Sequence, residues 1–215
     1  RTYVACRPLD YSELPDLVLL RLADFLKEED TTRLGMTCRR LRDLLPRFLV
    51  MRGEDFSVRG SGTGWGVVEP YFDGPRLPAG VKRLTVSVAG WKDQGWGNRK
   101  GELFVRLMRA PLQDSNASNQ SAKKGDKKDE DRRSRWRQEG ETQVAERRGF
   151  FGLAEHKETS ARLEMDGRES VVAGARSGDW YRFMRRAGGG GGHRLIVRGF
   201  RAVATLTNSQ CSLVV

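Results

Sequence analysis

Apolar and polar positions follow two different periods along this chain. Between residues 14 and 26 the apolar residues recur at helical spacing, and Pro15 suits a first helical turn, where its missing N–H costs nothing. A second apolar set runs from Leu34 to Leu45 at steps of four, three and four residues. The polar residues 27–30 between the two sets predict a short connection. We therefore expect small helices packed around a shared apolar stripe in the first quarter of the chain.

Farther along the chain the period changes to two, which is typical of a strand with one buried face. Residues 51–78 are rich in Gly and Pro and predict turns between short strands. Alternation or strand-forming residues then recur in six stretches: 81–91, 101–109, 161–165, 171–172, 180–184 and 193–206. Many short strands with Gly-rich turns favour an antiparallel β-sandwich. The predicted fold class is α+β, a small N-terminal helical module followed by this β-sandwich.

Residues 113–148 differ in composition from both parts. They mix opposite charges with Ser, Asn and Gln, and Trp136 and Val144 are their only large apolar residues. Such a segment cannot bury enough apolar surface to offset the entropy of ordering. We predict a disordered charged insertion in a surface loop. The expected organisation is a helical module over 9–50 and a β-sandwich over 51–112 and 149–215, with the insertion between its two parts.

The helical stretch resembles the F-box, a family whose pattern opens with Leu-Pro, continues through a helix with paired apolar residues, and then has Asp, Leu and Cys-Arg. The corresponding residues here are Leu14-Pro15, Val18-Leu19, Leu22, Phe25-Leu26, Asp30, Leu34, Cys38-Arg39, Leu41-Arg42 and Leu44. Two positions depart from the pattern, because Thr31 replaces the usual Leu after the Asp and Leu41 replaces the usual Trp. The alternative is an unrelated helical hairpin that caps the next domain.

The F-box resemblance implies docking onto a Skp-family linker protein of a cullin-RING ubiquitin ligase. The β-sandwich would then hold an unknown protein substrate, so that the chain acts as a substrate adaptor without chemistry of its own. The residues expected to contact the linker protein are Leu14, Pro15, Val18, Leu22, Phe25, Leu26, Leu34, Cys38 and Leu41. The alternative function is a β-sandwich module that binds protein or glycan, unconnected to ubiquitin, with the helices as a cap.

The stretch from Trp91 to Lys100 is the candidate substrate-binding loop. It combines large aromatic area with directional polar groups and sharp glycine bends, as recognition loops do. The candidate residues are Trp91, Asp93, Gln94, Trp96 and Asn98. A second interpretation is that the tryptophans plug one end of the sandwich while Asp93 and Asn98 bond the backbone of their own loop. Mutation separates the two, because loss of a buried group destabilises the fold and loss of an exposed one does not.

Catalytic and cofactor sites are not predicted. His156 and His193 lie in no nucleophile or metal-binding motif, and isolated turn residues such as Asp93 and Asp179 commonly bond their own backbone. The glycine run 188–192 lacks the Lys-Ser/Thr and helix that follow in a phosphate-binding loop, so we interpret it as backbone that passes close to other groups or adopts positive φ. We expect no enzyme, no metal and no cofactor.

The charge distribution and the cysteine content argue against two further classes of protein, nucleic-acid-binding and disulfide-rich. The formal charge of +11 is spread along the whole chain, whereas a nucleic-acid-binding arm usually concentrates its charge, so nucleic acid is not the expected partner. Three cysteines without a close pair do not suggest a disulfide framework. No apolar run is long enough to span a membrane, and the expected location is the cytoplasm or nucleus. Because the sequence begins at Arg1, we expect it to be part of a longer protein.

Overall fold

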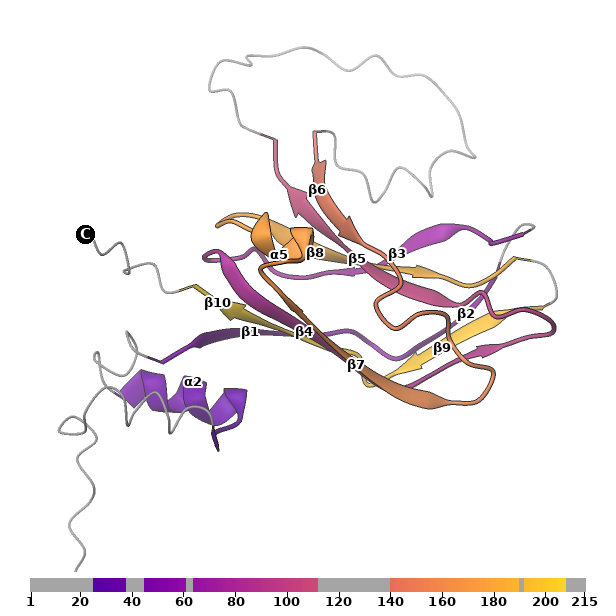
Figure 1. The fold of residues 1–215 in the computed structure, drawn as a ribbon, viewed down its shortest axis with the longest axis horizontal. Helices are drawn as coiled ribbons and strands as arrows, with labels where there is room; N and C mark the ends of the chain where they lie inside the picture. The colour runs from indigo at the N-terminus through magenta and orange to yellow at the C-terminus, as the bar shows by residue number, and fades with distance from the viewer. Residues whose placement is uncertain (1–24, 38–44, 61–63, 112–139, 190–191, 208–215) are drawn as a thin grey trace, which may run out of the picture.

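The structure is a computed structural model that describes residues 25–37, 45–60, 64–111, 140–189 and 192–207 (Figure 1). Two layers of strands run across the molecule, and a helix lies beside the first strand. The elements are α2 (Glu28–Thr37), β1 (Arg47–Arg52), β2 (Phe56–Arg59), β3 (Val68–Asp73), β4 (Val81–Gln94), β5 (Glu102–Arg109), β6 (Thr142–Arg147), β7 (Thr159–Asp166), α5 (Ser170–Ala173), β8 (Trp180–Arg186), β9 (Arg194–Arg198) and β10 (Arg201–Leu206).

One layer is built around the long strand β4. The first part of β4 pairs with β10 and the last part with β9, while β7 pairs along its other edge. β1 pairs with β10 and β2 with β9. β1 and β2 are thus two halves of one bent strand, as are β9 and β10, whose bend lies at Gly199 and Phe200. Gly199 has φ +58, a left-handed backbone that favours glycine.

The second layer contains β3, β8, β5 and β6 in that order, with every pairing antiparallel. If β1 with β2 and β9 with β10 are each counted as one bent strand, the described residues form strands in the orders 1-8-3-6 and 2-7-4-5. Two facing antiparallel sheets with this strand order form a jelly roll. The predicted antiparallel β-sandwich is therefore confirmed. Every connection except the β5–β6 hairpin crosses between the layers, and alternate connections lie at the same end of the sandwich.

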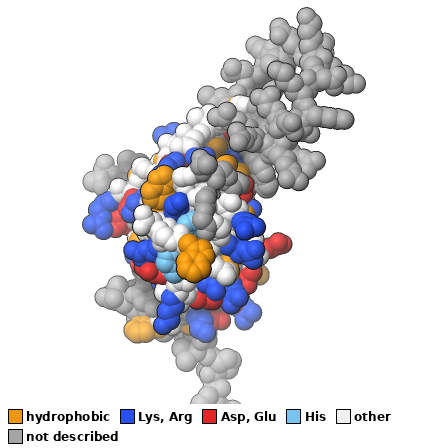
Figure 2. Space-filling model, turned by 90° about the vertical axis from the view of Figure 1, so that its right-hand side faces the viewer, with side chains coloured by type: hydrophobic (Ala, Val, Ile, Leu, Met, Phe, Trp, Pro, Cys, Tyr) orange, Lys and Arg blue, Asp and Glu red, His pale blue; other side chains and the backbone are white. Residues whose placement is uncertain are grey.

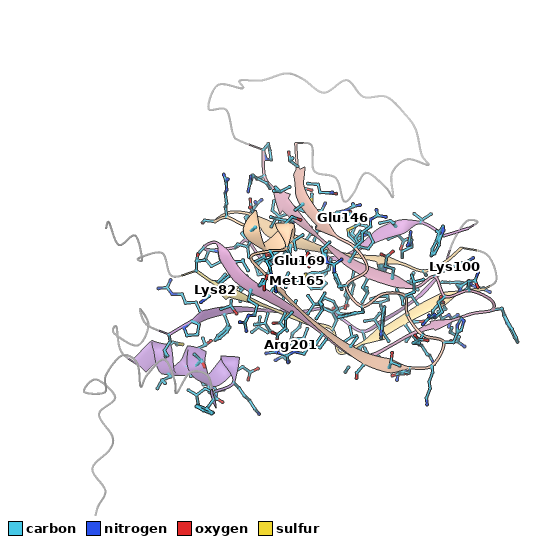
Figure 3. All side chains as sticks on the ribbon, in the orientation of Figure 1. Lys82, Lys100, Glu146, Met165, Glu169 and Arg201 are labelled. Carbon is cyan, nitrogen blue, oxygen red and sulfur yellow. The ribbon has the colours of Figure 1, made fainter. Side chains whose placement is uncertain are left out.

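Apolar side chains from both sheets fill the space between the layers. In β4 the predicted alternation holds, because Leu84, Val86 and Val88 are buried. The largest fully buried residues come from β5, β7, β8 and β9 as well, and Met165 of β7 lies between the layers (Figure 3). Phe72 and Phe183 stack with ring centroids 4.8 Å apart. This aromatic contact continues to Phe200 of the other sheet, 5.0 Å from Phe183, and so joins the two layers.

The structure differs from the sequence-based expectations at four places. α2 begins at Glu28, within the stretch expected to be a polar connection, and the backbone N–H of Thr31 donates to the carbonyl of Lys27. β1 runs across the expected domain boundary at residue 50. Val171 and Val172 form the short helix α5 and not a strand, because this segment must cross from β7 in one sheet to β8 in the other.

The fourth difference is β6, which lies inside the expected disordered insertion. Thr142–Arg147 pairs with β5, and the Nε of Arg106 donates to a carboxylate oxygen of Glu146 at 2.6 Å. The charges that argued against order are neutralised across the strand pair, which composition alone does not reveal. Residues 113–139 of the expected insertion lie outside the described residues. Among the described helices, none combines the length and apolarity needed to cross a membrane.

Candidate functional site

Four connections between the sheets lie at one end of the sandwich, and we call their described residues the loop end: 60 with 64–67, 95–101, 148–158, and 187–189 with 192–193. Their backbones touch directly, since the N–H of Gly60 donates to the carbonyl of His193 at 2.9 Å. A Cβ on Gly60 would lie 1.6 Å from the carbonyl oxygen of Gly188. A Cβ on Gly188 would in turn lie 2.2 Å from the Cβ of Lys100. Such close approach is available to glycine alone, so these glycines hold the loops as one rigid platform.

The glycine run 188–192 behaves as the sequence predicted at its described ends. Gly188 passes against Lys100, and Gly192 has φ +69. The Lys100 ammonium donates to the carbonyl of Gly189 at 2.9 Å, so this side chain ties the β4–β5 loop to the β8–β9 loop. Figure 3 shows Lys100 at the loop end and Lys82 at the other end of the sandwich.

A buried carboxylate, Asp93, organises the base of the platform. Its Oδ2 accepts hydrogen bonds from the backbone N–H of Lys100 at 2.6 Å and of Gly101 at 3.0 Å. The Nδ1 of His193 lies 2.9 Å from its Oδ1. Both Asp93 and His193 are buried. The β4–β5 loop is therefore closed by its own Asp, and that Asp is joined to the start of β9.

A β-bulge places Asp93 inside the molecule. Between Val88 and Trp91 the register of β4 against β7 shifts by one residue. Because side chains alternate with a period of two, one extra residue exchanges the two faces of the strand. Even-numbered residues face the core before the bulge, and Trp91 and Asp93 face it afterwards. A carboxylate at a position that would otherwise face water thus becomes part of the core.

His156 holds the same loop from the other side. Its Nδ1 lies 2.8 Å from the carbonyl oxygen of Asp93, and its Nε2 lies 3.0 Å from that of Gly97. Carbonyl oxygens only accept, so both contacts are hydrogen bonds only when both ring nitrogens carry protons. The bond to the Asp93 carbonyl, followed by the one to Gly97, raises the pKa of His156 above its ordinary 6.5.

This geometry predicts that the β4–β5 loop loosens as pH rises. A folded-state pKa above the unfolded value means that the His156 contacts are fully present below pH 6.5 and are lost as pH rises through the folded pKa. NMR titration should give a His156 midpoint above 6.5, and amide exchange at Gly97, corrected for its intrinsic pH dependence, should accelerate through that midpoint. In His156→Ala the corrected rate should be flat with pH, and a pH-dependent rate in that variant would contradict the assignment.

The predicted loop residues divide into two groups. Trp91 and Asp93 are buried, and the Trp91 ring meets Phe151 edge-on with centroids 5.4 Å apart. Gln94, Trp96 and Asn98 are exposed, Trp96 to 87%. The interpretation in which the loop plugs one end of the sandwich thus holds for its base, Trp91 and Asp93. The side chains at its tip are exposed to solvent. Figure 2 looks onto this end and shows hydrophobic side chains standing among Lys and Arg.

Trp65 was not among the predicted residues but lies at the same end. It is 55% exposed, and the guanidinium of Arg186 sits over its ring at 5.0 Å from the centroid. Arg186 in turn pairs with the carboxylate of Glu102. The sequence did carry a signal for Trp65, because this residue lies between Gly64 and Gly66 and has no apolar neighbours in sequence that would bury it.

The expected linker-binding residues are described only in part. Phe25 is 86% exposed, Leu26 is exposed and Leu34 is half-buried. Met36, which the pattern did not single out, is 76% exposed. The remaining expected residues, Leu14, Pro15, Val18, Leu22, Cys38 and Leu41, lie outside the described residues.

Sequence reasoning missed the contact between Asp93 and His193, because 100 residues separate them and neither belongs to a local motif. It also missed the burial of Asp179, whose carboxylate accepts from the Nε and Nη2 of Arg109, each at 2.7 Å, and from the backbone N–H of Arg176. Here the expectation that a turn Asp bonds nearby backbone holds, with an ion pair added. In the described part of the chain no cluster of three or more His, Cys, Asp or Glu could hold a metal ion.

Comparisons with known proteins give a distant likeness only. No family model and no curated protein matches the sequence. Among solved structures, T=1 particles derived from infectious bursal disease virus match at TM-score 0.41 and 13% identity, over 76% of this chain and 32% of that chain. The VP2 subviral particle of the same virus matches at TM-score 0.39 and 12% identity, over 76% and 33%. The chain spans about a third of the length of these capsid chains, and likeness at this level says nothing of what it binds.

Proposed function

We propose that this chain is the substrate-recognition adaptor of a Skp-cullin-F-box type ubiquitin ligase. The N-terminal helices dock on the Skp-family linker protein, and the loop end of the jelly roll binds the protein to be ubiquitinated. Binding raises the effective concentration of substrate lysines near the charged ubiquitin carrier, which accelerates transfer without a catalytic residue in the adaptor. The F-box-like pattern of residues 14–44 supports the first half of this proposal.

The exposed apolar side chains of the N-terminal region support the same assignment. Phe25 and Met36 are among the most exposed large hydrophobic residues of the described chain. Exposed apolar residues grouped in one short segment are typical of a surface that a partner covers. These side chains belong to the segment in which the F-box resemblance lies, so a linker protein that covers them fits the observation.

The observation that carries the proposal is the placement of two distinct exposed surfaces far apart on the described chain. α2 lies beside β1, and the guanidinium of Arg52, the last residue of β1, pairs with Glu29 at 3.0 Å. The loop end lies at the end of the sandwich away from α2 (Figure 1), and the exposed side chains of its loops include Trp65 and Trp96. A chain so arranged can bind two proteins at once and hold them apart, which is the task of an adaptor.

A linker-capture experiment tests the proposal. Leu14→Ala with Pro15→Ala removes the opening of the F-box-like pattern, and this double variant should capture at least tenfold less Skp-family linker protein while its jelly roll melts at an unchanged temperature. The matched control is Trp96→Ala, which should retain linker capture and lose proteins labelled in proximity to the chain. Undiminished linker capture by the double variant would overturn the F-box assignment.

The exposed tip of the β4–β5 loop also supports the second candidate, a protein- or glycan-binding module unconnected to ubiquitin. Trp96 offers an apolar surface, and Gln94 and Asn98 offer amide donors and acceptors beside it. The same capture experiment separates the two. A wild-type chain that captures no linker protein, yet loses its labelled partners on Trp96→Ala, is such a module.

A further inference from the structure

Two arginines lie directly opposite one another on the outer face of the sheet formed by β2, β9 and the last part of β4. Arg59 of β2 and Arg194 of β9 are partners in the strand register, and Gln94 of β4 is the next partner in the same row. In the neighbouring row Val58, Leu195 and Asp93 lie together and point inward. The alternation of a strand therefore places Arg59, Arg194 and Gln94 on the outward face.

Like charges directly opposite on neighbouring strands are unfavourable, because their Cβ atoms lie only about 4.5 to 5.5 Å apart. Neither Arg59 nor Arg194 forms an ion pair with a described carboxylate, and both are exposed. Elsewhere on the same sheet arginines do have acidic partners: Arg83 and Arg162 share Glu164, and Arg198 pairs with Glu158 at 3.3 Å. Unlike these three arginines, the Arg59–Arg194 pair is thus a positive site without an acidic partner among the described residues.

Further groups lie on both sides of this positive site along β4. Lys92 lies two residues before Gln94 on the same outward face and pairs in register with Ile196. Beyond Gln94 the chain reaches the exposed Trp96. We call Arg59, Arg194, Gln94 and Lys92 the basic row. It offers charged donors, one amide and an adjoining aromatic surface, along a length that suits a few residues of extended peptide.

We propose that the basic row binds an acidic segment of a protein, whose carboxylates pair with Arg59 and Arg194 while a neighbouring apolar side chain contacts Trp96. The inference rests on the proposed function, in which that segment belongs to the protein to be ubiquitinated. Charge complementarity carries it, since two adjacent guanidiniums without an acidic partner form charge-assisted hydrogen bonds with carboxylates. Such rim charges set partner choice and association rate.

The surroundings of the basic row favour a short acidic peptide over a nucleic acid. Glu158 with its partner Arg198 lies farther along the sheet, and the Asp55 carboxylate accepts from the N–H of Gly199 at 2.8 Å. These acids border the row on the side away from the loop tip and would repel a phosphate backbone that continued along it. A peptide with few carboxylates meets no such repulsion.

Fluorescence anisotropy on the full chain tests the proposal. The probe is a labelled decapeptide of alternating Glu and Ser, compared with alternating Gln and Ser and with a dT decanucleotide. The Glu peptide should bind at least fivefold more tightly than either of the other two, and its affinity should fall as salt rises from 50 to 500 mM, since exposed charges are screened. Absence of binding by the Glu peptide, or tighter binding of the dT decanucleotide, would overturn the proposal.

Matched variants locate the binding. Arg59→Ala with Arg194→Ala should weaken Glu-peptide binding about five- to tenfold, the expected effect of removing two exposed ion pairs. The same variant should melt no lower than the wild type, because it removes a repulsion. The control, Arg162→Ala with Arg168→Ala, makes the same charge change at arginines that already have acidic partners, and should change binding less than twofold. Equal weakening by both variants would show nonspecific attraction and overturn the assignment.

The outcome is independent of linker capture. If the chain captures no linker protein but the Glu peptide still depends on Arg59 and Arg194, the proposed function fails and the acidic-segment site stands. If the chain captures the linker protein but Glu-peptide affinity is unchanged when Arg59 and Arg194 are replaced, the adaptor role stands and this inference fails.

Discussion

Asp93→Ala should destabilise the protein by about 3 to 5 kcal/mol. The substitution leaves the backbone N–H groups of Lys100 and Gly101 without their acceptor and removes the partner of the buried His193 ring. Each buried donor left unpaired costs about 1 to 3 kcal/mol, and breaking a buried polar pair costs a similar total. Urea denaturation followed by tryptophan fluorescence measures the change in unfolding free energy.

The matched control is Asn98→Ala in the same loop. Asn98 is exposed, and a surface substitution of this kind is usually within about 0.5 kcal/mol of neutral. The two variants together separate the base of the loop from its tip. If Asp93→Ala left the unfolding free energy within 1 kcal/mol of the wild type, the carboxylate would not be the group that closes the loop.

Phe183→Ala should have a comparable effect on stability, about 3 to 5 kcal/mol, for a different reason. Phe183 is 1% exposed and contacts Phe72 of its own sheet and Phe200 of the opposite sheet. Removing its ring leaves a cavity between the layers and forfeits aromatic contacts on both sides. Thermal and urea unfolding measure the loss.

Phe25→Ala is the control for this substitution, since it removes the same atoms from a side chain that is 86% exposed. It should leave the unfolding free energy nearly unchanged while weakening capture of the linker protein if the proposed function is correct. Similar destabilisation by both variants would mean that the interlayer aromatic contacts do not dominate, and would argue against Phe183 as a joint between the sheets.

At the loop end, the residues that hold the backbone in place differ from the residues whose side chains are exposed. Glycines and the Asp93–His193 contact hold the backbone in place, so little entropy remains to be lost there on binding. Trp96 and Trp65 then present large side chains from this fixed base. A substitution at the tip should therefore alter the exposed surface without a loss of fold.

The sequence by itself determined several of the strands and the buried face of the first part of β4. In β4 the residues Leu84, Val86 and Val88 alternate with polar neighbours. After β7 comes the pair Asp166-Gly167, residue types that favour a turn, and the Asp166 carboxylate accepts from the N–H of Arg168 at 3.0 Å. Period and turn chemistry are local properties, so they can be read without the fold. The same local rules predicted the roles of Gly188 and Gly192.

Sequence periodicity and turn residues did not predict secondary structure where contacts with a distant segment of the chain determine it. Thr142–Arg147 is a strand because β5 supplies its hydrogen bonds and Arg106 its counter-charge. Val171 and Val172 have strand propensity but lie in a helical turn, because the chain must cross between the sheets there. Tertiary contacts outweigh propensities of a fraction of a kcal/mol per residue.

The candidate site itself divides in the same way. The amino-acid sequence alone shows that Trp91–Lys100 is a loop with aromatic and polar residues. Which of its side chains face the core depends on the bulge between Val88 and Trp91, which exchanges the two faces of β4 and buries Asp93. The pairing of Asp93 with His193, and of Arg59 with Arg194, depends on strand register between segments 100 or more residues apart. Register is set by how the two sheets close over their common core, and so only the tertiary structure decides it.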